Sequence, residues 1–317
     1  MGATIDHLGP AEVAAIGTRV AGNVAEAVKV PDAALRDVLV ALIAAGHVLI
    51  EDHPGVGKTA LARALARSID AEYARIQCTS DLLPSDVVGT NVFNQPEGRF
   101  EFRAGPVFAH IVLVDEINRA SPKTQSGLLE CMQEGHVTVD GFSHPLPVPF
   151  LVLATQNPIE YEGTYPLPEA QLDRFMVRVS LGYPSAAQEA EMLSAHAAGD
   201  RVLDVAPVAS LEEVLLAQQA AIDVHASEAL RRYVVSVLQR TRDDPRTALG
   251  ASPRAGLMLL KAAKANAVLE GRDHALPDDV QLLAPSVLTH RILLAPTAAG
   301  YSRSDVVRDA LAQVPAL

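Results

Sequence analysis

The sequence has no tryptophan, only two cysteines and no cluster of lysines or arginines in its 317 residues. Cys78 and Cys131 are too few for a disulfide framework, and both lie in apolar segments, so a reducing cytoplasm fits best. The N-terminus carries Asp6 and lacks the basic segment that opens a secretory signal peptide. The longest apolar stretch, 38–50, is interrupted by His47 and is shorter than the ~18 residues that a membrane helix needs. We therefore expect a soluble protein with no membrane insertion.

Positive charge is also in short supply. The chain carries 26 Lys plus Arg against 38 Asp plus Glu, a formal net charge of −12. Proteins that bind nucleic-acid backbones normally present a basic face, so this balance argues against DNA or RNA as the main partner. Apolar residues, in contrast, make up 49% of the chain, and its length suits two domains of about 150 residues each.

Short apolar runs separated by helical patterns predict an α/β fold. Two helical patterns, at 11–30 and 32–45, precede the first of these runs. Runs that are apolar on both faces suit a parallel sheet sandwiched by helices. Beyond about residue 182 only helical patterns follow, which predicts an α/β core over 1–182 and a small all-α domain over 183–317. The apolar runs lie at 47–50, 74–78, 111–114, 150–154 and 176–181.

A protruding hairpin is predicted inside the core at 136–149. Residues 136–142 alternate around Asp140 and Gly141, and an Asp-Gly pair is the strongest short hairpin signal. Three prolines follow, which confine the return strand to an edge.

A glycine-rich loop joins the first apolar run to a helix-forming segment at 60–69. Gly55 and Gly57 let successive N–H groups face inward as a phosphate cradle, which Lys58 and the Thr59 hydroxyl complete by reaching the phosphates and ligating magnesium. The pattern G-x-x-x-x-G-K-[ST] expects a glycine at position 52, so the match is partial, and an ordinary glycine-rich turn is the alternative. The expected nucleotide-binding residues are Asp52, His53, Pro54, Gly55, Val56, Gly57, Lys58, Thr59 and Ala60.

An apolar run at 111–114 ends in two carboxylates, Asp115 and Glu116. Acids at the carboxyl end of a buried strand lie where open α/β sheets bind their ligands. We expect Asp115 to hold magnesium through water, and Glu116 to orient and deprotonate the attacking water. Any strand that leaves a core can end this way, but the glycine-rich loop upstream strengthens the interpretation.

Three further polar residues complete the predicted site. Asn157 follows the fourth apolar run and is expected to lie beside Glu116, where it would hold the hydrolytic water or sense the γ-phosphate. Arg174 lies at a helix-to-strand junction, from which it could reach a neighbouring subunit's nucleotide. Arg254 falls in the first turn of a helix capped by Ser252, where a cation opposes the helix dipole and a nearby phosphate would explain it. A plain turn for Asn157, and surface salt bridges for both arginines, are the alternatives.

Together these segments resemble the AAA+ ATPases and, within them, the MoxR family. The resemblance spans nearly the whole chain. The family commonly has Asp where Walker A expects its first Gly, so Asp52 does not weaken the match. The matching segments are 54–59 as Walker A, 115–120 as Walker B with its following turn, 154–158 as sensor 1 and 167–175 as the arginine-finger segment.

The resemblance implies an ATPase that uses ATP and Mg²⁺ and assembles into a ring, usually a hexamer, with ATP bound between subunits. Arg174 would act on the neighbouring subunit's ATP, and Arg254 would be sensor 2, supplied by the helical lid. An insertion at about 81–107, made loop-rich by three glycines, and the hairpin at 136–149 would project toward the ring pore and the client. MoxR-type ATPases are thought to be chaperone-like remodellers, often alongside a protein with a von Willebrand factor A domain, in the maturation of metalloenzymes or other complexes.

Two other functions stay open. The same clade includes replicative helicases that grip DNA with this hairpin, although the net charge of −12 and the absence of Lys or Arg over 136–149 argue against a nucleic-acid translocase. A nucleotide-gated scaffold, whose assembly state is the signal, is disfavoured because every motif residue needed for hydrolysis is present.

Overall fold

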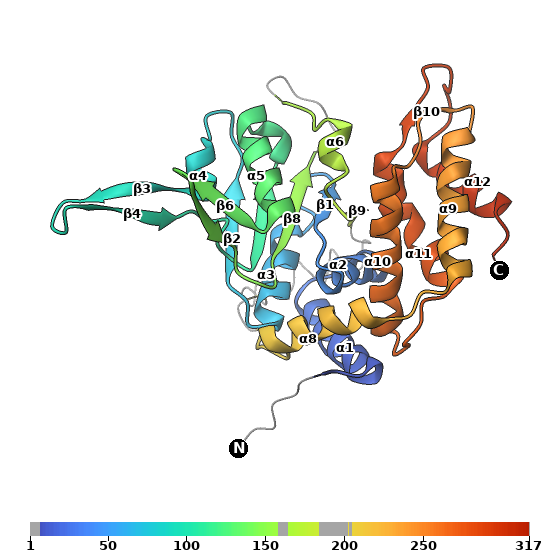
Figure 1. The fold of residues 1–317 in the computed structure, drawn as a ribbon, viewed down its shortest axis with the longest axis horizontal. Coiled ribbons are helices and arrows are strands. Elements are labelled where there is room, and N and C mark those ends of the chain that lie inside the picture. The colour runs from blue at the N-terminus through green and yellow to red at the C-terminus, as the bar shows by residue number, and fades with distance from the viewer. Residues whose placement is uncertain (1–6, 158–163, 184–201, 203–204, 317) are drawn as a thin grey trace.

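The core of the protein is a five-stranded parallel sheet in the order β2-β5-β8-β1-β9 (Figure 1). The computed structural model describes residues 7–157, 164–183, 202 and 205–316. All five predicted apolar runs form strands of this sheet, so the parallel α/β core is confirmed. In sheet order the strands are β2 (Tyr73–Gln77), β5 (Ile111–Asp115), β8 (Leu151–Gln156), β1 (Val48–Glu51) and β9 (Val177–Val179).

Successive residues of the central strand β5 face opposite sides of the sheet. Ile111 and Leu113 join a buried cluster with the helices on one face, whereas Val112 and Val114 join a second cluster with the helices on the other. All four side chains are fully buried, as expected for a sheet covered on both faces. The first face is covered by α1 (Pro10–Ala27), α2 (Asp32–Ile43) and α3 (Lys58–Ser68), and the second by α4 (Pro84–Val88) and α5 (Pro122–Glu134).

The C-terminal part is a helical lid on one side of the core (Figure 1). Its central helix α10 packs against α8, α9 and α11, and also against α1 and α2, so one buried cluster continues from the core into the lid. The boundary near residue 182 stays a prediction, and residues 184–201 lie outside the described part of the chain. The helices are α8 (Leu211–Asp223), α9 (Glu228–Asp243), α10 (Pro253–Leu269), α11 (Pro277–Leu288) and α12 (Arg303–Gln313).

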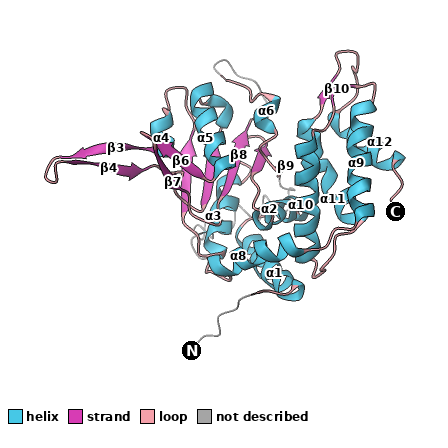
Figure 2. Cartoon of the chain, viewed as in Figure 1, coloured by secondary structure: helices cyan, strands magenta, loops and turns pink. Residues whose placement is uncertain are grey.

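The insertion at 81–107 is not loop-rich, and that prediction is wrong. After α4 it forms an antiparallel hairpin that extends away from the core on the side opposite the lid (Figure 2). Two of its glycines allow close packing, because a Cβ on Gly89 would lie 2.3 Å from the Arg103 carbonyl oxygen, and one on Gly105 would lie 2.3 Å from that of Val87, whereas Gly98 lies in the turn with a positive φ of 63°. The hairpin consists of β3 (Gly89–Asn94) and β4 (Arg99–Ala104).

The hairpin predicted at 136–149 is confirmed. Asp140 and Gly141 form its turn, both with positive φ (50° and 83°), as a tight two-residue hairpin turn requires. It also touches the first hairpin, since Asn91 Nδ2 donates to Asp140 Oδ2 at 2.7 Å and the rings of Phe102 and His144 stack 3.8 Å apart. Its strands are β6 (His136–Val139) and β7 (Phe142–Pro145).

The sequence pattern predicted an all-α lid, but the lid also contains two short strands. A short antiparallel pair joins β10 (Thr247–Leu249) to β11 (Leu293–Leu294), and strands this short show no periodicity that a sequence could reveal. Among the helices of the described residues, none is both long enough and apolar enough to cross a membrane. The remaining short elements are α6 (Glu169–Leu172), η1 (Ile117–Arg119) and η3 (Thr289–Arg291).

Candidate active site

A cavity of about 470 Å³ lies at the carboxyl ends of β1, β2, β5 and β8. Its volume falls within the range of small-molecule sites, and its place is where parallel sheets bind ligands. Most of the predicted nucleotide and catalytic residues are brought together here. The lining consists of Pro54, Gly55, Gly57, Lys58, Thr59, Ala60, Arg75, Gln77, Asp115, Glu116 and Asn157.

The glycine-rich loop has the backbone that a phosphate cradle needs. Gly55 and Gly57 have φ of 85° and 92°, a region that residues with a Cβ rarely adopt. Gly57 is the N-cap of α3, so the unpaired N–H groups of that helix's first turn lie at the cavity. Lys58 Nζ donates to the Asp52 carbonyl oxygen at 2.9 Å. Burial lowers the pKa of Lys58, and the nearby carboxylate of Asp115 opposes that shift.

The carboxylate of Asp115 is held from two sides. Its Oδ1 accepts a hydrogen bond from Thr155 Oγ1 at 2.7 Å, and its Oδ2 accepts one from Arg75 Nη2 at 2.6 Å. Arg75 also donates to Gln77 Oε1 at 2.8 Å. These contacts fix the acid at the end of β5, facing the helix that begins with Lys58 and Thr59.

Glu116 has an unusual backbone conformation. Its φ and ψ are 55° and 52°, in the left-handed region that non-glycine residues seldom occupy and that is over-represented at functional sites. Its N–H donates to Thr155 Oγ1 at 2.8 Å, which stabilises this turn. The carboxylate accepts hydrogen bonds from Gln77 Nε2 at 3.3 Å and Arg119 Nη1 at 2.8 Å. Glu116 is therefore oriented by side chains from two neighbouring strands and from η1.

Four of these partners were not predicted as site residues: Arg75, Gln77, Arg119 and Thr155. Arg75 and Gln77 are polar residues on β2, and their alternation was a signal that one face of this strand is not core. Their contacts with Asp115 and Glu116 depend on β2 lying beside β5, and the order of strands in a sheet cannot be inferred from the sequence alone. Thr155 is fully buried at the end of β8 and was predicted only as part of the segment 154–158, whose last residue lies outside the described residues.

Three of the predicted nucleotide-binding residues lie outside the described lining of the cavity. Val56 is buried in the hydrophobic cluster on the α1 face of the sheet. His53 stacks on the ring of Tyr183, with centroids 5.6 Å apart. The Asp52 carboxylate faces Ser180 and the two residues that follow it. Asp52 contacts the cradle through its carbonyl oxygen, which accepts from Lys58, and its carboxylate acts on the Lys58 ammonium only electrostatically, by raising its pKa.

Arg174 and Arg254 also lie outside the described lining of this cavity. Arg174 Nη1 donates to the Leu129 carbonyl oxygen at 2.5 Å, and Arg254 Nη1 donates to Gln133 Oε1 at 3.5 Å. Both guanidinium groups therefore face the C-terminal half of α5. As predicted, Arg254 is in the first turn of a helix, α10, whose N-cap Ser252 accepts a hydrogen bond from the Ala255 N–H.

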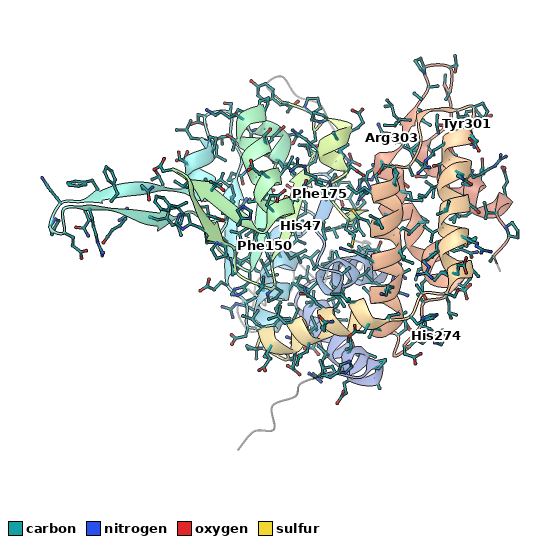
Figure 3. The ribbon with its side chains drawn as sticks, viewed as in Figure 1. His47, Phe150, Phe175, His274, Tyr301 and Arg303 are labelled. Atoms are coloured by element: carbon teal, nitrogen blue, oxygen red, sulfur yellow. The ribbon has the colours of Figure 1, made fainter. Side chains whose placement is uncertain are left out.

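The lid is fastened next to Arg174 by a buried arginine that the sequence did not single out. Arg291 has a side chain only 1% exposed and is ion-paired with Asp173. Its guanidinium also donates to the Phe175 carbonyl oxygen, to which His290 Nε2 donates at 3.1 Å. Figure 3 places Phe175 between the sheet and α10. Burial lowers the pKa of Arg291 to about 10, although the Asp173 carboxylate opposes the shift.

The donor set of the cavity fits magnesium. The Thr59 hydroxyl and the Asp115 carboxylate both belong to its lining, and hard oxygen ligands such as these are the ones that Mg²⁺ takes, usually with several waters.

Comparisons with known proteins agree with this geometry. Residues 47–177 match the family model of the ATPase family associated with various cellular activities (AAA), and residues 239–310 match the AAA lid domain. The chain is 51% identical to YeaC of Bacillus subtilis, described as uncharacterized, over 87% of each chain. It is 43% identical to the chaperone MoxR1 of Mycobacterium tuberculosis, over 83% of this chain and 72% of that one.

A solved structure extends the agreement to the fold. A crystal structure from Cytophaga hutchinsonii, described as a candidate ATPase, superposes with a TM-score of 0.90 at 38% identity and covers 97% of both chains. The predicted family, the α/β core with its helical lid and the ATPase class are therefore confirmed. By sequence, fold and domain composition, the chain belongs to the MoxR family of AAA+ ATPases.

Proposed function

We propose that this AAA+ ATPase works as a Mg²⁺-dependent ring, most simply a hexamer, and couples ATP hydrolysis to chaperone-like remodelling of a protein client. The observation that carries the proposal is the cavity itself. It brings the glycine-rich loop, Lys58, two carboxylates and Asn157 to one place at the end of the sheet. Phosphoryl transfer needs these groups because its catalysis is mostly positioning and charge stabilisation.

The loop, Lys58, Thr59, the two acids and Asn157 have separate tasks in this mechanism. The backbone N–H groups of the loop and the Lys58 ammonium would bind the phosphate oxygens, and Thr59 and Asp115 would hold magnesium, which would offset phosphate charge. Glu116 accepts the proton of the attacking water, and Asn157 orients that water or senses the γ-phosphate. Thr155 keeps both acids in place, since its hydroxyl bonds to the Asp115 carboxylate and the Glu116 N–H.

The two arginines support a ring. Arg174 and Arg254 both face α5 and lie outside the described lining of their own subunit's cavity. In a ring, this face would meet the neighbouring subunit's cavity, where an arginine stabilises the charge of the transition state. We therefore assign both residues to hydrolysis in trans, Arg174 as the finger and Arg254 as sensor 2.

Subunit mixing tests this assignment. Lys58→Ala rings lack a working phosphate cradle but keep Arg174, whereas Arg174→Ala rings have the opposite defect. Each variant should be nearly inactive alone, and a mixture of the two should recover part of the parent activity, because some interfaces combine an intact cradle with an intact finger. If the mixture is no more active than the separate variants, the arginine does not act across the interface.

The hairpins suit contact with a protein client. The β3–β4 hairpin carries Phe93 and Phe100, 51% and 70% exposed, whose rings contact each other 5.3 Å apart. Exposed apolar side chains of this kind are typical of protein-binding surfaces. Because Asn91 and Phe102 contact the second hairpin, the two hairpins form one projecting unit. We propose that this unit touches the client.

The proposed partner is suggested by the family, and the proposed cellular location is suggested by the two free cysteines. We propose a von Willebrand factor A domain protein as partner, maturation of a metalloenzyme or another complex as the task, and the cytoplasm as location. The last point is supported by Cys78 and Cys131, both buried free thiols. A Glu116→Gln trap loaded with ATP should retain client and partner, and Lys58→Ala, which cannot bind ATP tightly, is the control. Equal retention by both variants would contradict nucleotide-dependent client binding.

A further inference from the structure

The first residues of the glycine-rich loop contact the segment that leads from the core toward the lid. This linker, residues 180–183, follows the edge strand β9, which pairs with β1. Three consecutive residues, from the end of β1 into the loop, contact β9 and then the linker in the same order along the chain. Glu51 Oε2 accepts a hydrogen bond from Arg178 Nη1 at 2.6 Å, Asp52 contacts residues 180–182, and His53 stacks on Tyr183.

Asp52 is the centre of this contact. Its side chain is nearly buried, with an exposed fraction of 5%, and its Oδ2 accepts three hydrogen bonds. The donors are Ser180 Oγ at 3.2 Å, the Leu181 N–H, and the Gly182 N–H at 3.1 Å. A carboxylate suits this position because it accepts several hydrogen bonds at once, and charged acceptors bind N–H groups more strongly than neutral ones do.

The linker needs such an acceptor. Gly182 has φ of 64°, so the chain turns sharply just after β9 ends, and the turn presents the Leu181 and Gly182 N–H groups toward Asp52. The backbone at Asp52 does not itself adopt a positive φ, so no glycine is needed there. A side chain is therefore accommodated at the position where the phosphate-loop pattern expects glycine.

The same residue is also connected to the phosphate cradle. The Asp52 carbonyl oxygen accepts the hydrogen bond from Lys58 Nζ, and its N–H donates to the Gln156 carbonyl oxygen at 3.2 Å, one residue before Asn157. A phosphate in the cradle would compete with this carbonyl oxygen for the Lys58 ammonium. A single residue thus has its backbone at the cradle and its carboxylate on the linker.

We propose that Asp52 is a positioning residue that fastens the linker to the glycine-rich loop and so couples ATP binding to the orientation of the lid. This inference rests on the proposed ATP site. The proposed task of the Asp52 carboxylate is to hold the linker rather than to bind phosphate. The stacking of His53 on Tyr183 is a second contact between the loop and the linker, next to that of Asp52.

Hydrogen exchange tests the fastening without any nucleotide. In Asp52→Ala the amides of Leu181 and Gly182 lose their acceptor, so their exchange should accelerate about tenfold or more, the factor expected for one lost hydrogen bond to a charged group. In Asp52→Asn, which keeps a neutral acceptor oxygen, the exchange rates of these amides should lie between those of Asp52→Ala and those of the parent. Glu51→Gln is the matched control, since it removes the neighbouring carboxylate and its contact with Arg178 but leaves the linker bonds intact. Unchanged exchange in Asp52→Ala and Asp52→Asn would overturn the fastening.

Asp52→Gly tests the coupling, because it restores the residue of the phosphate-loop pattern and removes the carboxylate that holds the linker, and Asp52→Ala, which keeps a Cβ, controls for the added backbone freedom of glycine. Spin labels at two exposed positions, Lys123 in the core and Ala312 in the lid, report the distance between the two parts. In the parent, ATP should shift this distance. Asp52→Gly should bind ATP within a few-fold of the parent but show little of the shift.

The outcomes separate this inference from the proposed function. A parent that does not bind ATP contradicts the ATP site and the coupling together, while the nucleotide-free exchange experiment still decides the fastening. A parent that binds ATP without any change in distance overturns the coupling alone. If Asp52→Gly loses ATP binding while the linker amides exchange as in the parent, Asp52 belongs to the phosphate site and the inference is wrong.

Discussion

A buried histidine just before β1 should make the protein less stable in mild acid. His47 lies in the core beside Phe150 (Figure 3), with ring centroids 5.6 Å apart. Its Nε2–H donates to the Met132 carbonyl oxygen at 2.9 Å, and its Nδ1 accepts from the Val152 N–H at 3.1 Å. Both ring nitrogens are thus used by the neutral form. A proton on Nδ1 would point at another N–H.

Burial lowers the pKa of His47 from 6.5 to about 4. Because the folded pKa lies below the unfolded one, this contribution to stability is complete above pH 6.5 and is lost as the pH falls toward 4. At pH 5 the unfolded histidine is almost fully protonated and the folded one is almost neutral. The resulting loss in the free energy of unfolding, relative to pH 8, is about 2 kcal/mol for this residue alone.

The perturbation is His47→Gln, whose amide is neutral at both pH values. We expect the difference in the free energy of unfolding between pH 8 and pH 5 to shrink by about 2 kcal/mol in this variant, as measured by urea denaturation followed by circular dichroism. The control is His274→Gln, because His274 is exposed at the lower end of the lid (Figure 3) and its ion pair with the exposed Asp273 contributes little to stability, so the parent's pH dependence should be nearly kept. His290, also buried, has its pKa lowered by burial too, but it is present in all three proteins. If His47→Gln keeps the parent's full pH dependence, the reasoning is refuted.

Two further substitutions test the site and the lid contact. Thr155→Val removes the hydroxyl that orients Asp115 and Glu116, so turnover in steady-state kinetics should fall about tenfold or more. The affinity for ATP, measured by nucleotide titration, should change little. Turnover at the parent rate would mean that the hydroxyl is dispensable. Asp173→Ala leaves the Arg291 guanidinium buried without its carboxylate and should lower the free energy of unfolding by about 3–5 kcal/mol in urea denaturation. A loss below 1 kcal/mol would show that the carbonyl acceptors around Arg291 suffice.

The residues that could be predicted from the sequence are those whose task is local. Gly55 and Gly57 are required by backbone conformation, and Asp115 and Glu116 follow directly from an apolar strand, so their positions in the cavity could be foreseen. The hairpin turn at Asp140 was foreseen for the same reason.

The residues that could not be predicted depend on which elements become neighbours. Arg75 and Gln77 belong to the site only because β2 lies beside β5. Arg291, more than a hundred residues after Asp173, belongs to this contact because η3 packs against α6 and the residues that follow it. Asp52 illustrates the same limit, since the phosphate-loop pattern placed it in the cradle, whereas its carboxylate contacts the linker.

The most direct test of the central claim is ATP turnover by Glu116→Gln, measured together with ATP binding at a protein concentration at which the parent is fully assembled. Glu116 lines the cavity, and its carboxylate is the proposed base for the attacking water. The variant should bind ATP with an affinity close to the parent's, and its turnover should fall by about a hundredfold or more, the usual size of a general-base contribution. Turnover at the parent rate with parent-like binding would contradict the proposed mechanism.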